Sequence, residues 1–312
     1  MFDSKMQRPQ DLKAIAERQQ DLTARLARLA PVDGAHPTAF PSLTLVRGSV
    51  PTACTATVCQ PSLGFVVQGR KRALLNEEVF YYDALNYLVV SVTLPMMGQV
   101  LEATSERPFL CLRMDLDLEE IGRLLLELGD RGEAPVAADR GLFVARMDES
   151  LLDAVLRMVK LLDTPEDMAV LAPAVRREIY YRVLRGELGQ RLVDLAECDG
   201  GNHRIVRAIE WLKQHFTVPL RIEELAEAVH MSPSALHHRF KAVTAMSPLQ
   251  YQKHLRLHEA RRLMFAGGIE CATAGHRVGY ESSSQFSREY RRLFGAPPRI
   301  EIARLREIGI EA

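Results

Sequence analysis

The spacing of apolar residues predicts helices toward both ends of the sequence and strands between them. Residues 7–30 show the period of an amphipathic helix, and a turn-rich linker follows at 31–41. Residues 43–115 contain short apolar runs, rich in β-branched and aromatic side chains and separated by turn residues, a pattern typical of an antiparallel barrel or sandwich. Helical spacing then returns, with Asp117 and Glu120 at capping-box positions.

Two further helices are expected, at residues 148–163 and 173–185. The first carries an apolar stripe that is wide enough to contact its own domain and a second subunit. The stripe therefore fits either internal packing or a dimer interface. Its residues include Leu151, Leu152, Val155, Leu156 and Val159.

Length and charge divide the chain into two parts. The 312 residues suit two domains, and the glycine-containing breaks at 186–203 mark their boundary. Residues 201–312 contain 17 Lys+Arg and 11 Asp+Glu, whereas residues 1–200 contain the other 23 and 29. A basic C-terminal part joined to an acidic N-terminal part is typical of a nucleic-acid-binding module attached to another domain.

Composition also indicates a cellular location. No run of 18 apolar residues occurs, so no membrane span is expected. The N-terminus lacks the apolar segment of a secretory signal. The five cysteines are odd in number and scattered, which indicates reduced thiols in the cytoplasm.

The sequence MSPSALHHRFKAV has the pattern of the second helix of a helix-turn-helix unit. Ser232 is expected as its N-cap and Pro233 as its first residue. Leu236, Phe240 and Val243 point toward the core, so the other side is free to enter a DNA groove. The residues on that side are Ser234, Ala235, His237, His238 and Lys241.

The sequence VGYESSSQFSREYRRLFGAPP repeats this pattern. Ser282 is expected as the N-cap and Gln285 completes a capping box, while Gly295, Pro297 and Pro298 end the element. The inward face consists of Phe286, Tyr290 and Leu293. The face left for base edges and phosphates carries Ser283, Ser284, Gln285, Arg288, Arg291 and Arg292.

The two N-caps, Ser232 and Ser282, are 50 residues apart, and a helix is expected between them at 248–266. Such a helix is roughly 28 Å long at 1.5 Å per residue. Successive major-groove faces on one side of DNA are about 34 Å apart. The connecting helix is therefore long enough to hold two recognition helices in adjacent grooves.

The C-terminal hundred residues resemble the AraC/XylS family of transcription regulators. The resemblance is carried by LAEAVHMSPSALHHRFKAVTAMSPLQYQKHLRLHEARRLM and by VGYESSSQFSREYRRLFGAPP. It implies that Ser234, His237, His238, Ser283, Ser284, Gln285 and Arg288 face DNA, in agreement with the assignment by helix face. The segment CATAG departs from the family pattern, and Gly275 costs roughly 1 kcal/mol relative to Ala inside a helix.

The N-terminal part resembles the barrel domain found in one branch of this family. The matching segments are SLTLVRG, VVQGRKRALL, YLVVSVTLPMMGQVLEA and LCLRMDLD. In such proteins the domain is a cupin-like barrel that senses an effector and dimerises through nearby helices. The resemblance thus implies a homodimer, with the 151–162 stripe as its interface.

Other classes of protein and site fit the sequence less well. A metal-dependent cupin enzyme needs several His and Glu ligands, yet residues 43–115 contain no histidine. His237 and His238 fit a DNA-facing or solvent-facing position better than a metal site. No G-x-S-x-G, Walker or H-E-x-x-H motif occurs. We therefore expect no enzyme activity, metal or cofactor.

Two hypotheses about small molecules stay open. The cysteines Cys54, Cys59, Cys111 and Cys198 could sense oxidants if one had a lowered pKa, or could be bystanders. The cations Arg70, Lys71 and Arg72 could bind an anionic effector or could lie on a solvated hairpin. Candidate pocket residues are Phe65, Val67 and Met97.

The sequence thus predicts an α+β protein with two domains. Residues 1–186 form a cupin-like antiparallel β-barrel with flanking helices, residues 187–203 a linker, and residues 204–312 an all-α domain with two helix-turn-helix units. The predicted function is a cytoplasmic, ligand-sensing, sequence-specific DNA-binding transcription regulator. Its expected partners are double-stranded DNA, an unidentified small-molecule effector, a second copy of the chain and RNA polymerase. Activation is the working expectation, although the residues do not distinguish it from repression. A regulator with an empty barrel is the second alternative.

Overall fold

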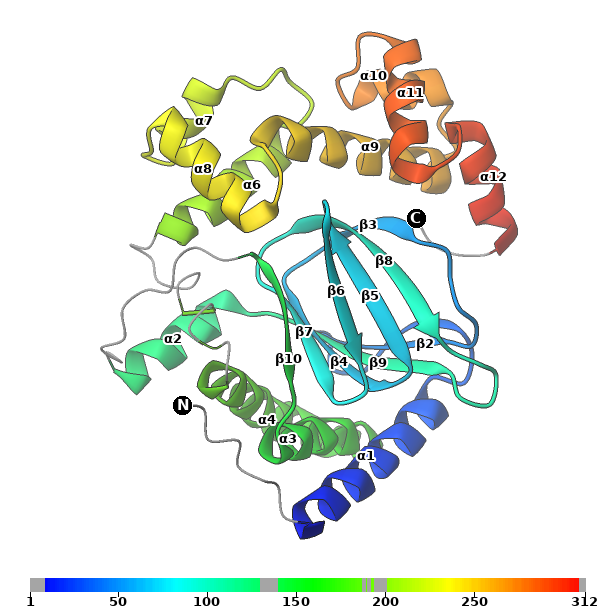
Figure 1. Cartoon of the computed structure of the whole chain (residues 1–312), viewed down its shortest axis with the longest axis vertical. Coiled ribbons are helices and arrows are strands. Elements are labelled where there is room, and N and C mark those ends of the chain that lie inside the picture. The colour runs from blue at the N-terminus through cyan, green and yellow to red at the C-terminus, as the bar shows by residue number, and fades with distance from the viewer. Residues whose placement is uncertain (1–8, 130–139, 187–188, 190–191, 194–200, 309–312) are drawn as a thin grey trace.

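Ten antiparallel strands form the N-terminal domain of the computed structural model, which describes residues 9–129, 140–186, 189, 192–193 and 201–308. They make two sheets, with the orders β1-β2-β9-β4-β7-β10 and β3-β8-β5-β6. The predicted antiparallel β domain is confirmed, as two facing sheets and not one closed barrel (Figure 1). The strands are β1 Gly34–Pro37, β2 Leu43–Gly48, β3 Thr55–Cys59, β4 Ser62–Gln68, β5 Arg70–Leu75, β6 Glu78–Asp83, β7 Asn86–Val90, β8 Leu94–Glu102, β9 Phe109–Asp115 and β10 Leu142–Arg146.

In the described part of the chain, a short 3₁₀ helix (Leu161–Asp163) and four α-helices belong to this domain, and three of the α-helices form a layer beneath the six-stranded sheet (Figure 1). The α-helices are α1 Pro9–Leu29, α2 Leu118–Leu128, α3 Glu149–Lys160 and α4 Pro165–Arg185. Side chains from α1, α3 and α4 share one apolar core with the outward face of β4 and β9. Asp117 caps α2 by accepting from the backbone N–H of Glu120, whereas the Glu120 carboxylate pairs with Arg176 at 2.5 Å. The predicted capping box is therefore only half formed, because Arg176 competes for its second member.

Seven helices form the C-terminal domain above the sheets, within the described part of the chain (Figure 1). They are α6 Gly201–His215, α7 Ile222–Ala228, α8 Pro233–Thr244, α9 Pro248–Ala266, α10 Cys271–Arg277, α11 Ser283–Phe294 and α12 Pro298–Ile308. The core of α6–α8 is continuous with the apolar interior between the two sheets, whereas α10–α12 have a separate core. The two halves of this domain are thus attached to the sheets in different ways.

Three elements differ from the sequence prediction in the N-terminal domain. Residues 34–37, predicted as linker, form the edge strand β1, which pairs with β2. Residues 142–146 form β10, which pairs with β7 where helices alone were expected. Helix α4 begins at Pro165, eight residues before the predicted start at Pro173. Pro173 cannot donate to the carbonyl of Ala169, and Ala169 lies on the exposed side of the helix.

The end of the chain also differs. Pro297 and Pro298 were expected to end the last element, but Pro298 is the first residue of α12. A proline costs little at the first position of a helix, where its missing N–H would have no intrahelical partner. Most of the predicted linker at 187–203 lies outside the described residues.

The stripe on α3 is core and not surface. All five of its residues assigned to a dimer interface are at most 4% exposed, and they pack against α1, α4 and the six-stranded sheet. Of the two alternatives left open by the pattern, the structure favours internal packing. The five residues are Leu151, Leu152, Val155, Leu156 and Val159.

Candidate nucleic-acid interface

Helix α8 has the construction of a recognition helix. Ser232 caps it by accepting from the N–H of Ala235 at 3.3 Å, and Pro233 is its first residue, as predicted. Leu236, Phe240 and Val243 are fully buried. The predicted DNA-facing residues lie on the other side, where Ala235 is half-buried and Ser234, His237, His238 and Lys241 are exposed.

Helix α11 presents a second polar face. Ser282 caps it by accepting from the N–H of Gln285 at 3.3 Å, while the Gln285 side chain turns to Glu289. The capping box is therefore half formed, because the Gln285 side chain bonds to Glu289 and not to the backbone of Ser282. Phe286 and Tyr290 are fully buried. All six predicted DNA-facing residues are exposed: Ser283, Ser284, Gln285, Arg288, Arg291 and Arg292.

The two helix-turn-helix units are a structural repeat with an offset of 50 residues. Helix α8 ends at Ala245 and α11 ends at Gly295, and both residues have left-handed backbone conformations. The connecting helix α9 covers the predicted residues 248–266 and starts with a complete capping box between Ser247 and Gln250. Pro248 and Pro298 are the first residues of the helices that follow the two units. Because these prolines are also 50 residues apart, the repeat predicts α12 from the sequence.

The two units are in direct contact through a glycine turn. Gly279 has a φ of +89°, and a Cβ atom there would lie 2.0 Å from the carbonyl oxygen of Thr217 in the first unit. Arg256 donates to the carbonyls of Phe216 at 2.6 Å and Gly279 at 2.9 Å. A backbone that close admits only glycine, so the turn sets the position of one recognition helix relative to the other.

Gly275, the departure from the family pattern, also has a packing role. A Cβ atom at this position would lie 3.0 Å from the Phe286 ring. The glycine therefore lets α10 approach α11 closely, which offsets its poor helix propensity.

The first unit is held on the sheet domain by its backbone. The Arg140 guanidinium, paired with Glu78, donates to the carbonyl of Ala242 at 2.6 Å, near the end of α8. Gly141 donates to the carbonyl of Val243 at 2.8 Å. The Tyr251 hydroxyl on α9 donates to the carbonyl of Thr93 at 2.7 Å. The first unit is therefore joined to the sheet domain both by these hydrogen bonds and by a shared apolar core.

The second unit is held by a buried polar network. Arg261 on α9 donates to the carbonyl of Ala56 on β3 at 3.1 Å and pairs with Glu301 at 2.9 Å. The Tyr290 hydroxyl of α11 donates to the same carboxylate at 2.8 Å. Arg261 is 8% exposed and also lies 4.9 Å from the Phe294 ring. One arginine thus links β3, α9, α11 and α12.

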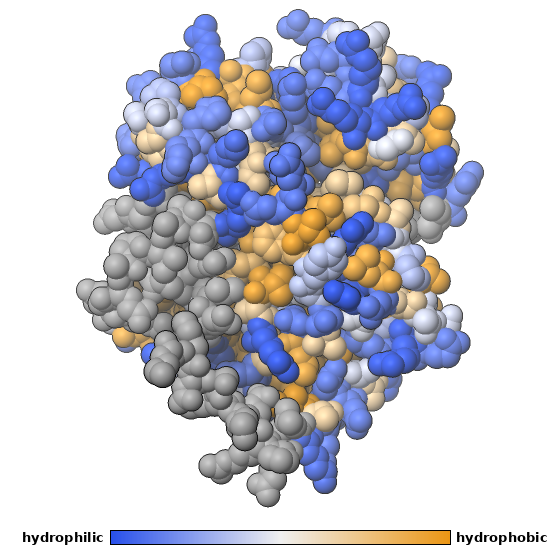
Figure 2. All heavy atoms as spheres, in the orientation of Figure 1, coloured by the Kyte–Doolittle hydropathy of each residue, from blue (hydrophilic) through white to orange (hydrophobic). Residues whose placement is uncertain are grey.

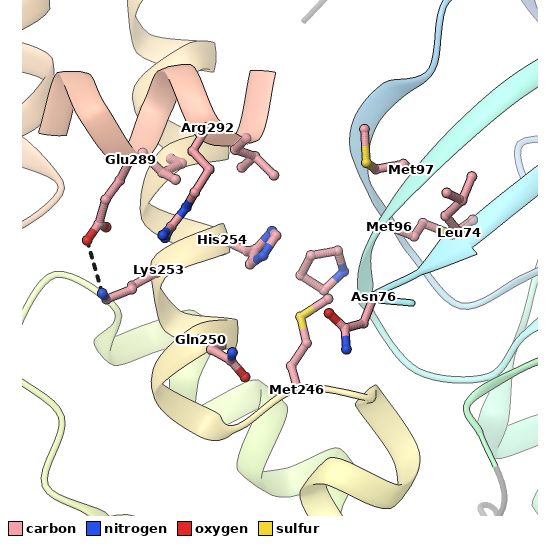
Figure 3. Close-up of a pocket in the computed structure, with 13 residues that line it drawn as sticks. Leu74, Asn76, Met96, Met97, Met246, Gln250, Lys253, His254, Glu289 and Arg292 are labelled. Atoms are coloured by element: carbon pink, nitrogen blue, oxygen red, sulfur yellow. Dashed lines mark hydrogen bonds and ion pairs between the residues drawn. The ribbon is translucent and has the colours of Figure 1, made fainter. Parts of the chain in front are cut away.

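A cleft of about 370 Å³ lies between the two domains beside this network (Figure 3). Its walls come from β5, β8 and the β5–β6 turn on one side and from α9 and α11 on the other. Figure 2 shows apolar side chains gathered where the helical domain meets the sheets. Arg292 lines the cleft, whereas the other five predicted residues of α11 do not.

The predicted effector residues separate into two groups. Phe65 and Val67 are fully buried in the core shared with the helical layer and do not line the interdomain cleft. The sequence placed them on the wrong face of β4, because the strand is buried on both sides and shows no alternation. Met97 does line the interdomain cleft.

The cations of β5 are arranged as a hairpin surface. Arg70 lies 3.6 Å from Glu102, and Arg72 donates to Gln99 at 2.8 Å. The Lys71 amine lies 5.8 Å from the centre of the Phe109 ring. The hairpin alternative is supported for Arg70 and Arg72, since both have partners on adjacent strands, although the Arg70 Nε is buried without a hydrogen-bond partner among the described residues.

Burial makes two of the cysteines poor sensors. It raises the pKa of Cys111 to about 11 and also raises the pKa of Cys59. Both thiols are therefore protonated at neutral pH, which slows reaction with oxidants. Cys198 lies outside the described residues. Among those that are described, no three His, Cys, Asp or Glu side chains gather as a metal site. No described helix is long and apolar enough to cross a membrane.

Sequence reasoning missed three arginines that matter to this surface. Arg140 and Arg261 join the domains, and no periodicity in the sequence distinguishes them from surface cations. Arg239 is exposed on α8 beside the predicted residues. The helix face does carry a signal for Arg239, because it lies next to His238 and outside the buried stripe.

Two capped recognition helices on one connecting helix, joined to an antiparallel sheet domain, define a two-domain DNA-binding protein. Models of the AraC-type transcriptional regulator N-terminus and of a helix-turn-helix domain match residues 39–191 and 225–300. The chain belongs to the AraC/XylS family of transcription regulators.

Relatives and solved structures agree with this assignment. The HTH-type transcriptional activator RhaS of Salmonella schwarzengrund (strain CVM19633) is 30% identical over 155 residues, which cover 49% of this chain and 55% of RhaS. RhaS of Salmonella agona (strain SL483) is 31% identical over the same length. The chain spans about half the length of the curated relatives it matches.

The fold is also that of ToxT from Vibrio cholerae. An apo ToxT variant of strain SCE256 has a TM-score of 0.57 at 10% identity, over 84% of this chain and 97% of ToxT. Wild-type ToxT of that strain with a bound unsaturated fatty acid has a TM-score of 0.54 at 10% identity, over 84% and 93%. At this identity the likeness concerns the fold alone.

Proposed function

We propose that this protein is a sequence-specific transcription activator that acts on DNA in the cytoplasm and includes no catalytic step. The observation that carries the proposal is the pair of exposed polar faces on α8 and α11. The two helices are related by an offset of 50 residues in the sequence and are connected by α9. Each helix begins with a capped turn of small polar residues and continues with cations. This order suits base edges at the helix start and phosphates farther along.

The residues divide into two kinds of contact. Arg288 has no partner among the described residues and can bond two acceptors of a guanine. Lys241 and Arg291 occupy equivalent positions in the repeat, toward the ends of their helices, where they suit phosphates. The other residues proposed to face the bases are Ser234, His237, His238, Ser283, Ser284 and Gln285, all of which are exposed.

The test is a selection of genomic fragments by the purified full-length protein at two salt concentrations. A bound motif with two short blocks about one helical turn apart supports two recognition helices in adjacent grooves. Binding that falls with salt but shows no motif would leave only a nonspecific cation surface. In that case the proposal of sequence-specific control fails.

Control by a small molecule is the second part of the proposal. It is supported by the position of the interdomain cleft, which touches the sheet domain and both α9 and α11. ToxT, which shares this fold, has been crystallised with an unsaturated fatty acid. A molecule bound in the cleft would alter how the second unit sits on the sheets.

We also propose a second copy of the chain and RNA polymerase as partners. Any dimer must use a surface other than the α3 stripe, because its five residues are core. Sedimentation of the full chain over a range of concentrations tests the dimer. Transcription from the selected motif by purified RNA polymerase, with and without the protein, distinguishes activation from repression.

A further inference from the structure

The glutamine in the first turn of α11 is held differently from its counterpart in α9. Gln250 and Gln285 each lie three residues after a serine N-cap, Ser247 or Ser282. The Gln250 Oε1 accepts from the backbone N–H of Ser247 at 2.9 Å and completes a capping box. The Gln285 Nε2 instead donates to the Glu289 carboxylate at 3.3 Å. A side-chain carboxylate, and not the helix cap, therefore orients the Gln285 amide.

Glu289 is itself held firmly in place. Its carboxylate pairs with Lys253 of α9 at 3.0 Å (Figure 3) and accepts from the Tyr280 hydroxyl at 2.8 Å. The Glu289 side chain is only 13% exposed. Burial opposes its ionisation, but the hydrogen bonds from Lys253, Tyr280 and Gln285 outweigh this effect and hold the pKa of Glu289 below its usual value. Glu289 is thus an ionised and well-anchored carboxylate at neutral pH.

An ionised carboxylate determines which end of an amide can face it. A carboxylate only accepts hydrogen bonds, so the Nε2 end of Gln285 must point toward Glu289. The opposite orientation would bring Oε1 against a carboxylate oxygen, and two acceptors would then be in contact. The amide nitrogen has two N–H groups, and Glu289 takes one of them. The exposed edge of Gln285 keeps one acceptor, Oε1, and one donor.

One acceptor beside one donor matches the major-groove edge of adenine. Adenine offers the N6 amino group as a donor and N7 as an acceptor, and glutamine can bind both at once. Guanine offers two acceptors, N7 and O6, which would oppose Oε1. A glutamine that rotates freely can turn both N–H groups toward guanine. Glu289 prevents this because it holds one of those N–H groups away from the exposed edge.

We infer that Gln285 reads an adenine in the DNA block bound by α11, and that Glu289 is the positioning residue that gives this preference. The inference rests on the proposed sequence-specific binding of DNA and names one base of the site. With the 50-residue offset, the equivalent positions of the first unit hold Ala235 and Arg239. The methyl group of Ala235 cannot form the paired hydrogen bonds. This preference for adenine is therefore expected in one block only.

The first test compares DNA selections by two forms of the full-length protein. Fragments are selected from randomised double-stranded DNA with the unaltered chain and with Gln285→Ala. The unaltered chain should recover adenine at one position of the second block, and the variant should lose that preference alone. If Gln285→Ala keeps every base preference, or if the base that it loses is not adenine, the inference is overturned.

The second test is Glu289→Gln, which has nearly the same shape and no charge. A neutral amide can donate or accept, so both orientations of Gln285 become possible. The ratio of Kd values for guanine and adenine at that position should fall about 10-fold. In Gln285→Ala, the added Glu289→Gln change should have no further effect on this ratio, because Glu289 acts through Gln285.

A matched variant and a second base position serve as controls. Glu281→Gln removes the same charge from an exposed side chain just before α11 and should leave the ratio unchanged. The base choice that depends on Arg288 should also persist in Glu289→Gln, whereas a general structural defect would weaken it equally. Loss of preference at both positions, or an unchanged ratio in Glu289→Gln, would contradict the role of Glu289.

The same selections separate this inference from the proposed function. If the unaltered protein recovers a two-block motif but Gln285→Ala and Glu289→Gln behave like it, only the inference is wrong. If the unaltered protein recovers no motif, sequence-specific regulation fails and the inference fails with it. Thermal unfolding of each variant confirms that it is folded.

Discussion

The Arg261 guanidinium of α9 donates to the backbone carbonyl of Ala56 on β3 at 3.1 Å, across the boundary between the two domains. The first helix-turn-helix unit shares an apolar core with the sheets, whereas the second has its own core. The second unit therefore depends on polar contacts with the sheet domain. Arg261 is central among these because it also pairs with Glu301.

Replacement of Arg261 by methionine should destabilise the docked second unit. The substitution leaves Glu301 buried without its cation, and loss of one partner of a buried pair costs about 3–5 kcal/mol. Arg262→Met is the matched control, since Arg262 forms an exposed pair with Glu259 and its loss costs at most about 1 kcal/mol. Urea unfolding of both variants measures the difference, and equal losses would show that Arg261 has no special role.

Two cations on the recognition helices should respond differently to removal. Arg288→Ala is expected to cost about 1–3 kcal/mol on the selected motif and to relax base choice at one position. Lys241→Ala should weaken binding to all sequences alike and reduce the slope of log K against log[salt] by about 1. Affinities on the motif and on random DNA test both. An equal loss on the two DNAs for Arg288→Ala would remove it from the base-reading set.

The C-terminal domain was predictable because its signals are local. Ser232 and Ser282 cap helices where the sequence placed them, α9 covers the expected residues 248–266, and Gly295 ends α11 in the left-handed conformation. Each signal depends on a few neighbouring residues and on the 3.6-residue period. Helix α12 was missed because Pro298 was interpreted as a stop, although proline is equally suited to the start of a helix.

The contacts between the domains were not predictable in the same way. Arg261 and Ala56 are separated by 205 residues, and no local pattern pairs them. The apolar stripe on α3 fitted either internal packing or a dimer interface. Only the packing of α1 and α4 against it distinguishes these two alternatives. Phe65 and Val67 belong to a strand buried on both faces, which hides which side faces the second sheet. Long-range packing decided all three cases.

Replacement of Gly279 by alanine should disturb the relative position of the two recognition helices. The new Cβ atom would lie 2.0 Å from the Thr217 carbonyl oxygen and would also impose a left-handed backbone on alanine. Gly295→Ala is the control, since φ is +80° there and nothing lies within 4 Å. The control should cost about 1–2 kcal/mol for the backbone alone, and Gly279→Ala a further 1–3 kcal/mol or so from the clash.

The same pair of variants should separate stability from DNA geometry. Gly279→Ala should lose affinity for the two-block motif but keep affinity for a single block, because each helix is intact and only their spacing changes. Gly295→Ala should bind both DNAs as the unaltered protein does. If Gly279→Ala binds the two-block motif normally, the contact with Thr217 does not set the spacing of the helices.

Two histidines of α9 should make the folded protein sensitive to acid. Burial, with Arg292 second, lowers the pKa of His254 to about 4, and burial, with His254 and Arg261 second, lowers the pKa of His258 to about 3. Both imidazoles are neutral when folded but take up protons near pH 6.5 when unfolded. The free energy of unfolding is therefore not reduced by these histidines above about pH 6.5, and it falls as the pH drops from 6.5 toward 4. Urea unfolding across this range should show a loss of roughly 3 kcal/mol for each histidine by pH 4, and the loss should be smaller in His258→Gln. An identical pH dependence in that variant would show that His258 titrates normally in the folded protein.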